Sequence, residues 1–148
     1  MDDASNFGSI ALLVSKDRAY SEWQKIEASW TLKLGIPVCA VHLDGAKEFT
    51  QGLMAKHMAS KGIDVQITAP YAHSKNGKIE CYIQTIEDGI QTLIADSKLP
   101  LSFWGNAALT VVYLHNRLIT STLPDDQTPY EAMNHSKPDL PHLRIWGC

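Results

Sequence analysis

The chain lacks any long apolar run, and this absence excludes an ordinary membrane-spanning helix. Its 148 residues are 45% apolar and 20% charged, which is typical of a soluble globular protein with one core. The longest apolar runs, such as residues 36–41, have the length of a strand and not of a bilayer-spanning helix. The opening Met1-Asp2-Asp3 has neither the basic nor the apolar segment of a signal peptide, so we expect an intracellular protein without a membrane partner.

Cysteine is scarce, and basic residues are not in excess. Cys39, Cys81 and Cys148 are far apart, so the sequence predicts neither a disulfide framework nor a zinc knuckle. The six histidines are also scattered and predict no zinc site. The net charge of −3 argues against strong DNA affinity of the chain by itself, because nucleic-acid-binding domains usually carry a basic patch.

Apolar periodicity predicts strands that alternate with helices, which is typical of an α/β domain. The first half is expected to contain a strand at 9–14, a helix at 19–34 ended by Gly35, a strand at 36–43, a helix at 47–60 ended by Gly62, and a strand at 65–68. The second half is expected to contain a polar loop at 69–77, a helix at 79–96, a buried helix at 101–119, and an irregular segment from 120 onward. We therefore assign residues 1–120 to the core domain and 121–148 to a C-terminal extension.

Two carboxylates occupy positions suited to holding a metal ion. Asp44 follows the strand at 36–43, and Glu80 is expected to open the helix after the polar loop. Carboxylates are hard oxygen ligands of the kind that Mg²⁺ prefers, and paired metal ions serve phosphodiester chemistry. Taken alone the pair is weak support, because the chain has 16 acidic residues and most are expected to be solvated surface charges. Glu80 also has a structural explanation, a favourable interaction with the helix dipole.

The context of the two carboxylates resembles the integrase catalytic core of copia-type retrotransposons, within the retroviral integrase superfamily. Thirty-five residues, 45 to 79, separate Asp44 from Glu80, as between the last two acids of that family's catalytic triad. Residues 41–49 are similar to the family's strand-Asp-Asn-Gly-Gly-Glu-Phe segment. Further landmarks occur in the family's order, namely Asp2-Asp3-Ala4-Ser5, Gly62-Ile63, Pro70-Tyr71, Asn76-Gly77, Leu99-Pro100, Phe103-Trp104, Tyr113-Leu114, Asn116-Arg117 and Thr128-Pro129-Tyr130-Glu131.

The resemblance implies an RNase H-like fold, with a mixed central sheet flanked by helices, and a role in DNA integration. It implies that Asp44 and Glu80 are catalytic metal ligands for Mg²⁺ or Mn²⁺. It also implies that Lys75, Asn76 and Lys78 bind nucleic acid; for the two lysines, simple surface solvation is an equally good explanation. The expected partners are element cDNA ends and target DNA, RNA as a further nucleic acid, and other copies of the chain, with the nucleus as the place of action.

The chain departs from the family in ways that predict impaired chemistry. If Asp2-Asp3 matches the family's second strand, the first strand and its catalytic aspartate have no counterpart here, and Asp2 or Asp3 would lie on the wrong strand to replace it. Lys47 stands where the family has a glycine that tolerates positive φ. The helix that carries Glu80 has no Lys or Arg between residues 79 and 96, so it would repel DNA phosphates.

These departures leave three functional hypotheses. The first is a transposon-derived integrase core that is inactive as an isolated chain. The alternative is a non-catalytic, domesticated interaction module on the same scaffold, which a large exposed apolar patch would favour. The third is another RNase H-like nuclease, and the landmarks from Phe103-Trp104 to Thr128-Pro129-Tyr130-Glu131 argue against it because they resemble copia integrases specifically.

Overall fold

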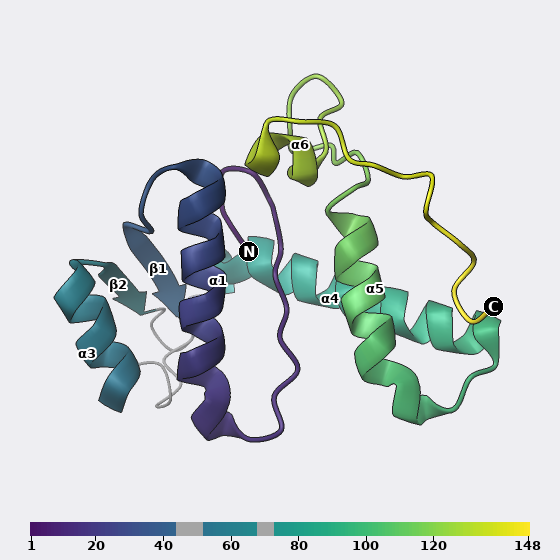
Figure 1. Ribbon diagram of the computed structural model, residues 1–148, viewed down its shortest axis with the longest axis horizontal. Helices are drawn as coiled ribbons and strands as arrows, with labels where there is room; N and C mark the ends of the chain where they lie inside the picture. The colour runs from purple at the N-terminus through teal and green to yellow at the C-terminus, as the bar shows by residue number, and fades with distance from the viewer. Residues whose placement is uncertain (44–51, 68–72) are drawn as a thin grey trace. The chain divides into compact units, whose positions relative to one another are not determined.

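The computed structural model describes residues 1–43, 52–67 and 73–148, with the backbone alone at 73–76 (Figure 1). The elements in chain order are η1 (Lys16–Arg18), α1 (Ala19–Leu34), β1 (Ala40–Leu43), α3 (Gly52–Lys61), β2 (Asp64–Ile67), α4 (His73–Ser97), η2 (Leu101–Phe103), α5 (Trp104–His115) and α6 (Pro129–Asn134). The chain divides into two compact units. One is continuous, Leu13–Lys78, and the other joins Met1–Leu12 to Ile79–Cys148.

A small parallel sheet with its helices forms the core of the continuous unit. β1 pairs in parallel with β2, from Ala40 opposite Asp64 to Leu43 opposite Ile67. The buried side chains of Met54, Met58 and Ile63 pack against one face of this sheet and against α1. The partly buried residues around them are Tyr20, Trp23, Val38, Val41, Leu43 and Val65. Successive side chains of a strand point to opposite faces of the sheet, so Val41 and Leu43 point to the same face and both pack on this core.

Glycine ends both helices of the continuous unit, as the sequence predicts. Gly35 has φ +69° and donates its N–H to the Thr31 carbonyl at 2.9 Å, which closes α1 at the expected residue. Gly62, also with φ +69°, follows α3. Only glycine adopts this left-handed conformation without a Cβ penalty, so both helix ends can be predicted from the residue type.

Two strand predictions require correction. Residues 9–14 are not a strand; they run without regular structure, because an apolar run becomes a strand only when a neighbour supplies a hydrogen-bonded ladder. The strand expected at 36–43 begins only at Ala40, and Pro37, which has no N–H to donate, lies in the part that is lost. The described residues contain a sheet of two strands, in agreement with the prediction of an incomplete sheet.

In the second unit, α4 and α5 cross closely. Ile86 and Ile94 of α4 are buried, as are Ala107, Ala108 and Val112 of α5. A methyl group on Gly89 would lie 2.7 Å from Val111 Cγ1, so the small residue permits the close approach of the two helices. Within the described residues, no helix combines the length and the apolar character needed to cross a membrane.

Helix boundaries in this unit differ from the sequence predictions. α4 begins at His73, so residues 73–77 are helical and not part of a loop; residues 68–72 lie outside the described residues. The helix expected at 101–119 is α5, which ends at His115 and is preceded by the short turn η2. The segment after 120 was expected to be irregular, but it contains α6, which begins with a capping box between Thr128 and Glu131.

The first residues of the chain are fixed to the end of α5. The Asn116 side chain accepts a hydrogen bond from Gly8 N and donates one to Gly8 O, both at 2.8 Å. Asn6 Nδ2 donates to Thr122 Oγ1 at 2.9 Å. Asn116 therefore satisfies the backbone of Gly8 as a neighbouring strand would, across 108 residues of sequence.

Candidate metal and nucleic-acid site

The first candidate ligand, Asp44, follows β1 directly. It belongs to residues 44–51, which lie outside the described residues. The flanking elements on both sides are described: β1 ends at Leu43, and α3 begins at Gly52. Ligands of parallel sheets typically bind beyond the carboxyl ends of the strands, and β1 ends one residue before Asp44 in the sequence.

The second candidate, Glu80, lies on α4 and is exposed. The sequence placed it at the start of a helix, but α4 begins seven residues earlier, at His73. Glu80 therefore lies two turns inside the helix, where the dipole interaction proposed for a first-turn carboxylate is weak. The same helix is anchored by the buried side chains of Ile86 and Ile94, so the backbone that carries Glu80 is fixed by packing.

The donor chemistry of Glu80 fits a hard divalent cation, because an exposed carboxylate supplies oxygen ligands and leaves room for water. The described part of the chain contains no group of three His, Cys, Asp or Glu side chains that could hold a metal ion. The other predicted ligand, Asp44, lies outside those residues.

The three predicted nucleic-acid contacts lie in the first two turns of α4. Lys75 and Asn76 are in the helix, and their side chains lie outside the described part of the structure. Lys78 is described and exposed. The placement on a helix, and not on a loop, gives the three residues a rigid mount.

The exposed face of α4 beyond Lys78 is acidic. Glu80, Glu87 and Asp88 are all exposed, and Gln84 Nε2 donates to Asp88 Oδ1 at 3.0 Å. Residues 79–97 include no Lys or Arg. Glu80, Glu87 and Asp88 therefore face solvent, and the repulsion of DNA phosphates expected from them stays a prediction.

Several sequence landmarks have structural roles in the second unit. Asp2 Oδ2 accepts hydrogen bonds from Ser5 N at 2.7 Å and Ser5 Oγ at 2.6 Å. The guanidinium of Arg117 lies 3.5 Å from the centre of the Tyr113 ring and 4.7 Å from that of Tyr130. These landmark residues therefore have structural roles in packing. Their presence is evidence for the fold and not for a particular reaction.

Two buried polar groups accompany this packing. Tyr82 and His115 meet edge to face, with ring centres 4.9 Å apart. Tyr82 Oη and His115 Nδ1 are buried and have no hydrogen-bond partner in the described part of the chain. Burial raises the pKa of Tyr82 to about 12 and lowers the pKa of His115 from its usual 6.5.

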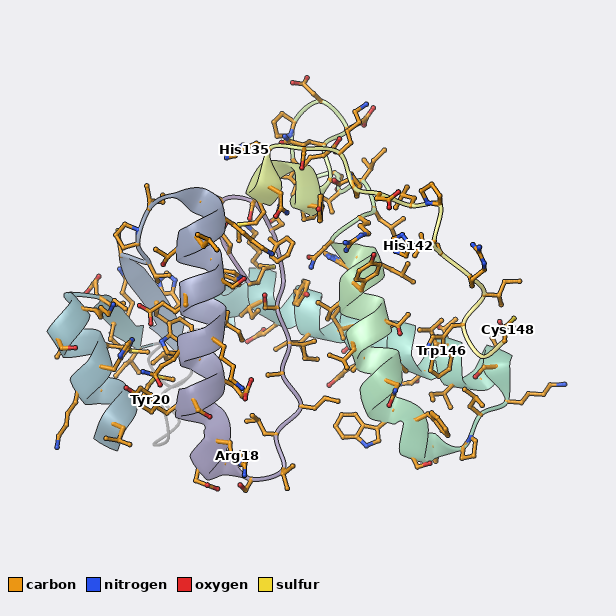
Figure 2. The ribbon with its side chains drawn as sticks, viewed as in Figure 1. Arg18, Tyr20, His135, His142, Trp146 and Cys148 are labelled. Atoms are coloured by element: carbon orange, nitrogen blue, oxygen red, sulfur yellow. The ribbon has the colours of Figure 1, made fainter. Side chains whose placement is uncertain are left out.

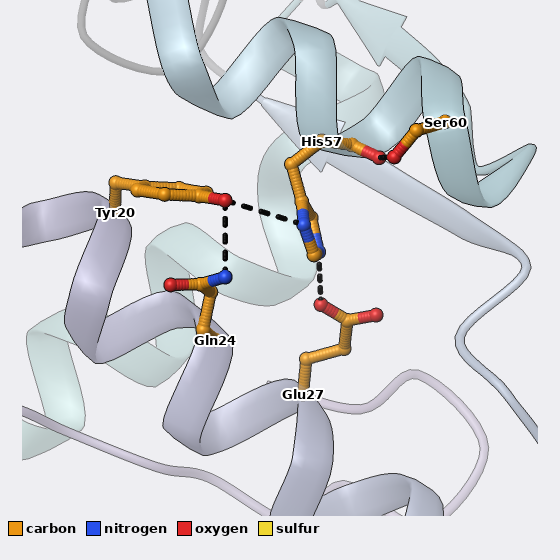
Figure 3. Close-up of polar contacts among 5 residues, drawn as sticks. All are labelled: Tyr20, Gln24, Glu27, His57 and Ser60. Carbon is orange, nitrogen blue, oxygen red and sulfur yellow. Dashed lines mark hydrogen bonds and ion pairs between the residues drawn. The ribbon is translucent and has the colours of Figure 1, made fainter.

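One polar cluster was missed by sequence reasoning. Tyr20, Gln24 and Glu27 lie on one face of α1, spaced by four and three residues, and meet His57 of α3 (Figure 3). Glu27 is buried, although a glutamate in a helix is ordinarily expected at the surface. No periodic signal in the sequence distinguishes it from its exposed neighbours.

Comparison with known proteins shows that the chain is similar to retrotransposon polyproteins. No protein-family model matches it. It is similar to the Retrovirus-related Pol polyprotein from transposon TNT 1-94 of Nicotiana tabacum, with 29% identity over 148 residues, 100% of this chain and 11% of that polyprotein. It is similar to the corresponding polyprotein from transposon RE1 of Arabidopsis thaliana, with 28% identity over 93 residues, 63% of this chain and 6% of that polyprotein. The chain therefore spans a small part of these relatives.

Solved integrase cores have the same fold. The HTLV-2 integrase catalytic core domain, in complex with magnesium and in a trimeric form, matches with a TM-score of 0.64 and 17% identity, over 89% of this chain and 80% of that chain. A chain of the simian T-cell lymphotropic virus intasome in complex with PP2A regulatory subunit B56 gamma matches with a TM-score of 0.62 and 18% identity, over 89% of this chain and 45% of that chain. The fold is therefore RNase H-like, as the sequence predicts.

Proposed function

We propose that this chain, related to retrotransposon Pol polyproteins and folded as an integrase catalytic core, derives from a domain that joins element cDNA ends to target DNA. The reaction would be a metal-dependent polynucleotidyl transfer. The observation that carries the proposal is Glu80, an exposed carboxylate on a packed helix of a fold shared with a magnesium-bound core. DNA, other copies of the chain and the nucleus belong to the same proposal, and RNA binding stays a prediction.

Asp44 and Glu80 are the residues that would hold Mg²⁺ or Mn²⁺. The ion, when bound, would stabilise charge on the phosphodiester oxygens of DNA. The protein's own contribution is to mount Asp44 after β1 and Glu80 on α4, and to present Lys75, Asn76 and Lys78 to the nucleic acid. These three residues occupy the N-terminal part of α4, where the helix dipole also attracts phosphate.

We infer that the isolated chain is impaired. Two carboxylates in place of three hold one ion weakly, whereas two-metal catalysis requires charge on both the attacking and the leaving oxygen. The exposed acidic face of α4, formed by Glu80, Glu87 and Asp88, adds repulsion of the DNA phosphates.

A strand-transfer assay tests the catalytic part of this proposal. Labelled duplex ends and a target duplex are incubated with the chain in Mg²⁺ or Mn²⁺, and we expect no joined product above that of the Glu80→Gln variant. Robust transfer that Glu80→Gln abolishes would overturn the inferred impairment and would place the site at Glu80. Transfer that survives Glu80→Gln would refute the site assignment.

A charge-reversal experiment tests the DNA-binding part. Glu87→Lys with Asp88→Lys changes two exposed acids of α4, and we expect DNA affinity at low salt to rise several-fold, with a steeper salt dependence. The matched control is Asp125→Lys with Asp126→Lys, which makes the same charge change at two exposed acids outside α4. Equal gains in the two variants would mean that net charge matters and the α4 face does not.

The non-catalytic interaction module has one observation in its favour. Leu101, Phe103 and Trp104 are exposed by 77%, 42% and 58% at the start of α5, which is unusual for large apolar side chains so close in sequence. Under this alternative, Leu101→Ser with Trp104→Ser would abolish binding of a protein partner while the charge reversals on α4 would leave it unchanged. The opposite pattern would support DNA as the ligand.

A further inference from the structure

Four side chains form a connected polar cluster between α1 and α3, all within the continuous unit (Figure 3). His57 Nε2 lies 2.5 Å from Glu27 Oε2, and each of these two side chains is only 11% exposed. On the other side of the ring, His57 Nδ1 lies 3.5 Å from Tyr20 Oη. Gln24 Nε2 donates to the same phenol oxygen at 3.0 Å.

The hydrogen bonds define the roles of the two ring nitrogens. When Glu27 is ionised and His57 is neutral, the carboxylate only accepts, and the ring then carries its proton on Nε2. Nδ1 then offers a lone pair to the Tyr20 hydroxyl. The Tyr20 oxygen accepts from Gln24, and its own proton is left to be donated to Nδ1. A hydroxyl that donates to a base, which a carboxylate orients in turn, is the arrangement of an activated nucleophile.

We propose that Tyr20 is a covalent modification site, whose phenol accepts an acyl group from an activated acyl donor with His57 as its general base. In the reaction, the phenol oxygen forms a bond to the acyl carbon, and the bond from that carbon to the leaving group breaks. The phenol proton passes to His57 Nδ1 and from there to the leaving group. Glu27 orients the ring and stabilises the transient imidazolium, and Gln24 stabilises the developing phenolate. This inference does not depend on the proposed integrase function.

Tyr20 is accessible to solvent as well as hydrogen-bonded to its neighbours in the cluster. It is half-buried near the N-terminus of α1 (Figure 2), and its hydrogen bond with Gln24 is exposed to solvent. In the described part of the chain, the titratable side chains that contact the His57 ring are those of Tyr20 and Glu27, both on α1. The ring of His57 meets that of Tyr20 edge to face, at 5.6 Å between centres.

The chain provides its own control in a second tyrosine beside a histidine. Tyr113 Oη lies 2.5 Å from His142 Nε2, and His142 is on the C-terminal segment (Figure 2). The carboxylate of Asp139 lies 3.8 Å from His142 Nδ1 and is 83% exposed. His142, the histidine beside Tyr113, therefore has no buried carboxylate to fix its tautomer. Water screens its interaction with the exposed Asp139.

The experiment uses N-acetylimidazole as the acyl donor on the full chain, with peptide mass spectrometry to locate acetyl groups that hydroxylamine removes. We expect Tyr20 to be acetylated about a hundredfold faster than Tyr113, at the lower end of what a positioned base contributes. His57→Gln and Glu27→Gln should each remove most of this difference. The melting temperature of every variant, followed by circular dichroism, shows whether it is folded.

A pH profile separates base assistance from a merely structural cluster. With His57 as base, the Tyr20 rate should level off above the titration of the imidazole, and this plateau should vanish in His57→Gln. Tyr20 and Tyr113 reacting at equal rates would overturn the proposal, as would a Tyr20 rate unaffected by a folded Glu27→Gln chain. If His57→Gln does not fold, the Glu27→Gln comparison alone decides, because the base then remains in place.

Discussion

Gly8 is the residue at which one added methyl group should have a large effect. A Cβ at this position would lie 1.8 Å from Tyr82 Oη and 2.6 Å from Tyr82 Cζ. Because the backbone of Gly8 is fixed by Asn116, the methyl group can be accommodated only if Tyr82 moves. We expect Gly8→Ala to lower the free energy of unfolding by about 1–3 kcal/mol, measured by urea denaturation.

The matched control for Gly8→Ala is the same substitution in a Tyr82→Phe background. Removing the hydroxyl removes the atom at 1.8 Å, and that hydroxyl has no hydrogen-bond partner among the described residues. Part of the lost stability should return. An equal loss in both backgrounds would show that the clash with Tyr82 is not the cause.

His115 should make the stability of the chain fall in mild acid. Burial holds the pKa of His115 below its unfolded value of 6.5, so the unfolded chain binds this proton more readily than the folded chain does. The contribution of neutral His115 to the free energy of unfolding is fully present above pH 6.5 and is lost as the pH falls through the folded pKa. His115→Asn should flatten this part of the profile of unfolding free energy against pH, whereas His135→Asn, at an exposed histidine, should leave it unchanged.

Single residues of this kind were largely beyond prediction from the sequence. The apolar spacing of Tyr82 in α4 predicts a core-facing ring, but nothing in the sequence pairs it with Gly8 or His115, which are far away along the chain. Glu27 was equally hidden, because its burial depends on a partner from another helix, His57. Such contacts follow from tertiary packing and not from local pattern.

At the scale of elements, the free edge of β1 should drive association. Among the described residues, β1 pairs only with β2, so its other edge presents unpaired backbone groups. We expect the sedimentation coefficient to rise with protein concentration, and Ala40→Lys, at an exposed position of β1, to suppress the rise. Ala59→Lys on the exposed surface of α3 is the matched control. A monomer at all concentrations would contradict this prediction.

Element boundaries were predictable where a single residue decides them. Gly35 and Gly62 end their helices because their φ values require glycine, and both ends were predicted. The start of α4 at His73 was missed because Gly77 and the polar residues before it favour a loop, while the long apolar face that follows stabilises the additional turns. The strand at 9–14 failed for the opposite reason, since a strand depends on a partner that the local sequence does not contain.

At the scale of the whole molecule, we predict that Asp44 and Glu80 share one divalent ion. Mn²⁺ titration followed by electron paramagnetic resonance measures the affinity. Asp44→Asn and Glu80→Gln should each weaken binding, and the double variant should be little weaker than either one, because a shared ion is lost only once. Losses that add independently would mean two separate sites.

The fold class was predictable, whereas the residues of the site were predictable only as candidates. The order and spacing of the landmarks fit the RNase H-like fold, and integrase cores with TM-scores of 0.64 and 0.62 confirm it. Glu80 is an exposed residue within α4 and not at its start, and its neighbourhood depends on how distant segments meet. Sequence spacing alone does not determine that arrangement.

The bonding of Gly8 to Asn116 also bears on how the chain is made. Residues Met1–Leu12 are synthesised before Leu13–Lys78, whereas their partners in Ile79–Cys148 are synthesised after it. The unit Leu13–Lys78 is continuous and can collapse while translation proceeds. Phe7, which is buried in the folded chain, and its neighbours then stay exposed to solvent until α5 has been synthesised. A chaperone that binds nascent apolar segments would therefore find a substrate in residues 1–12, and a ribosome that stalls before α5 would leave these residues unfolded.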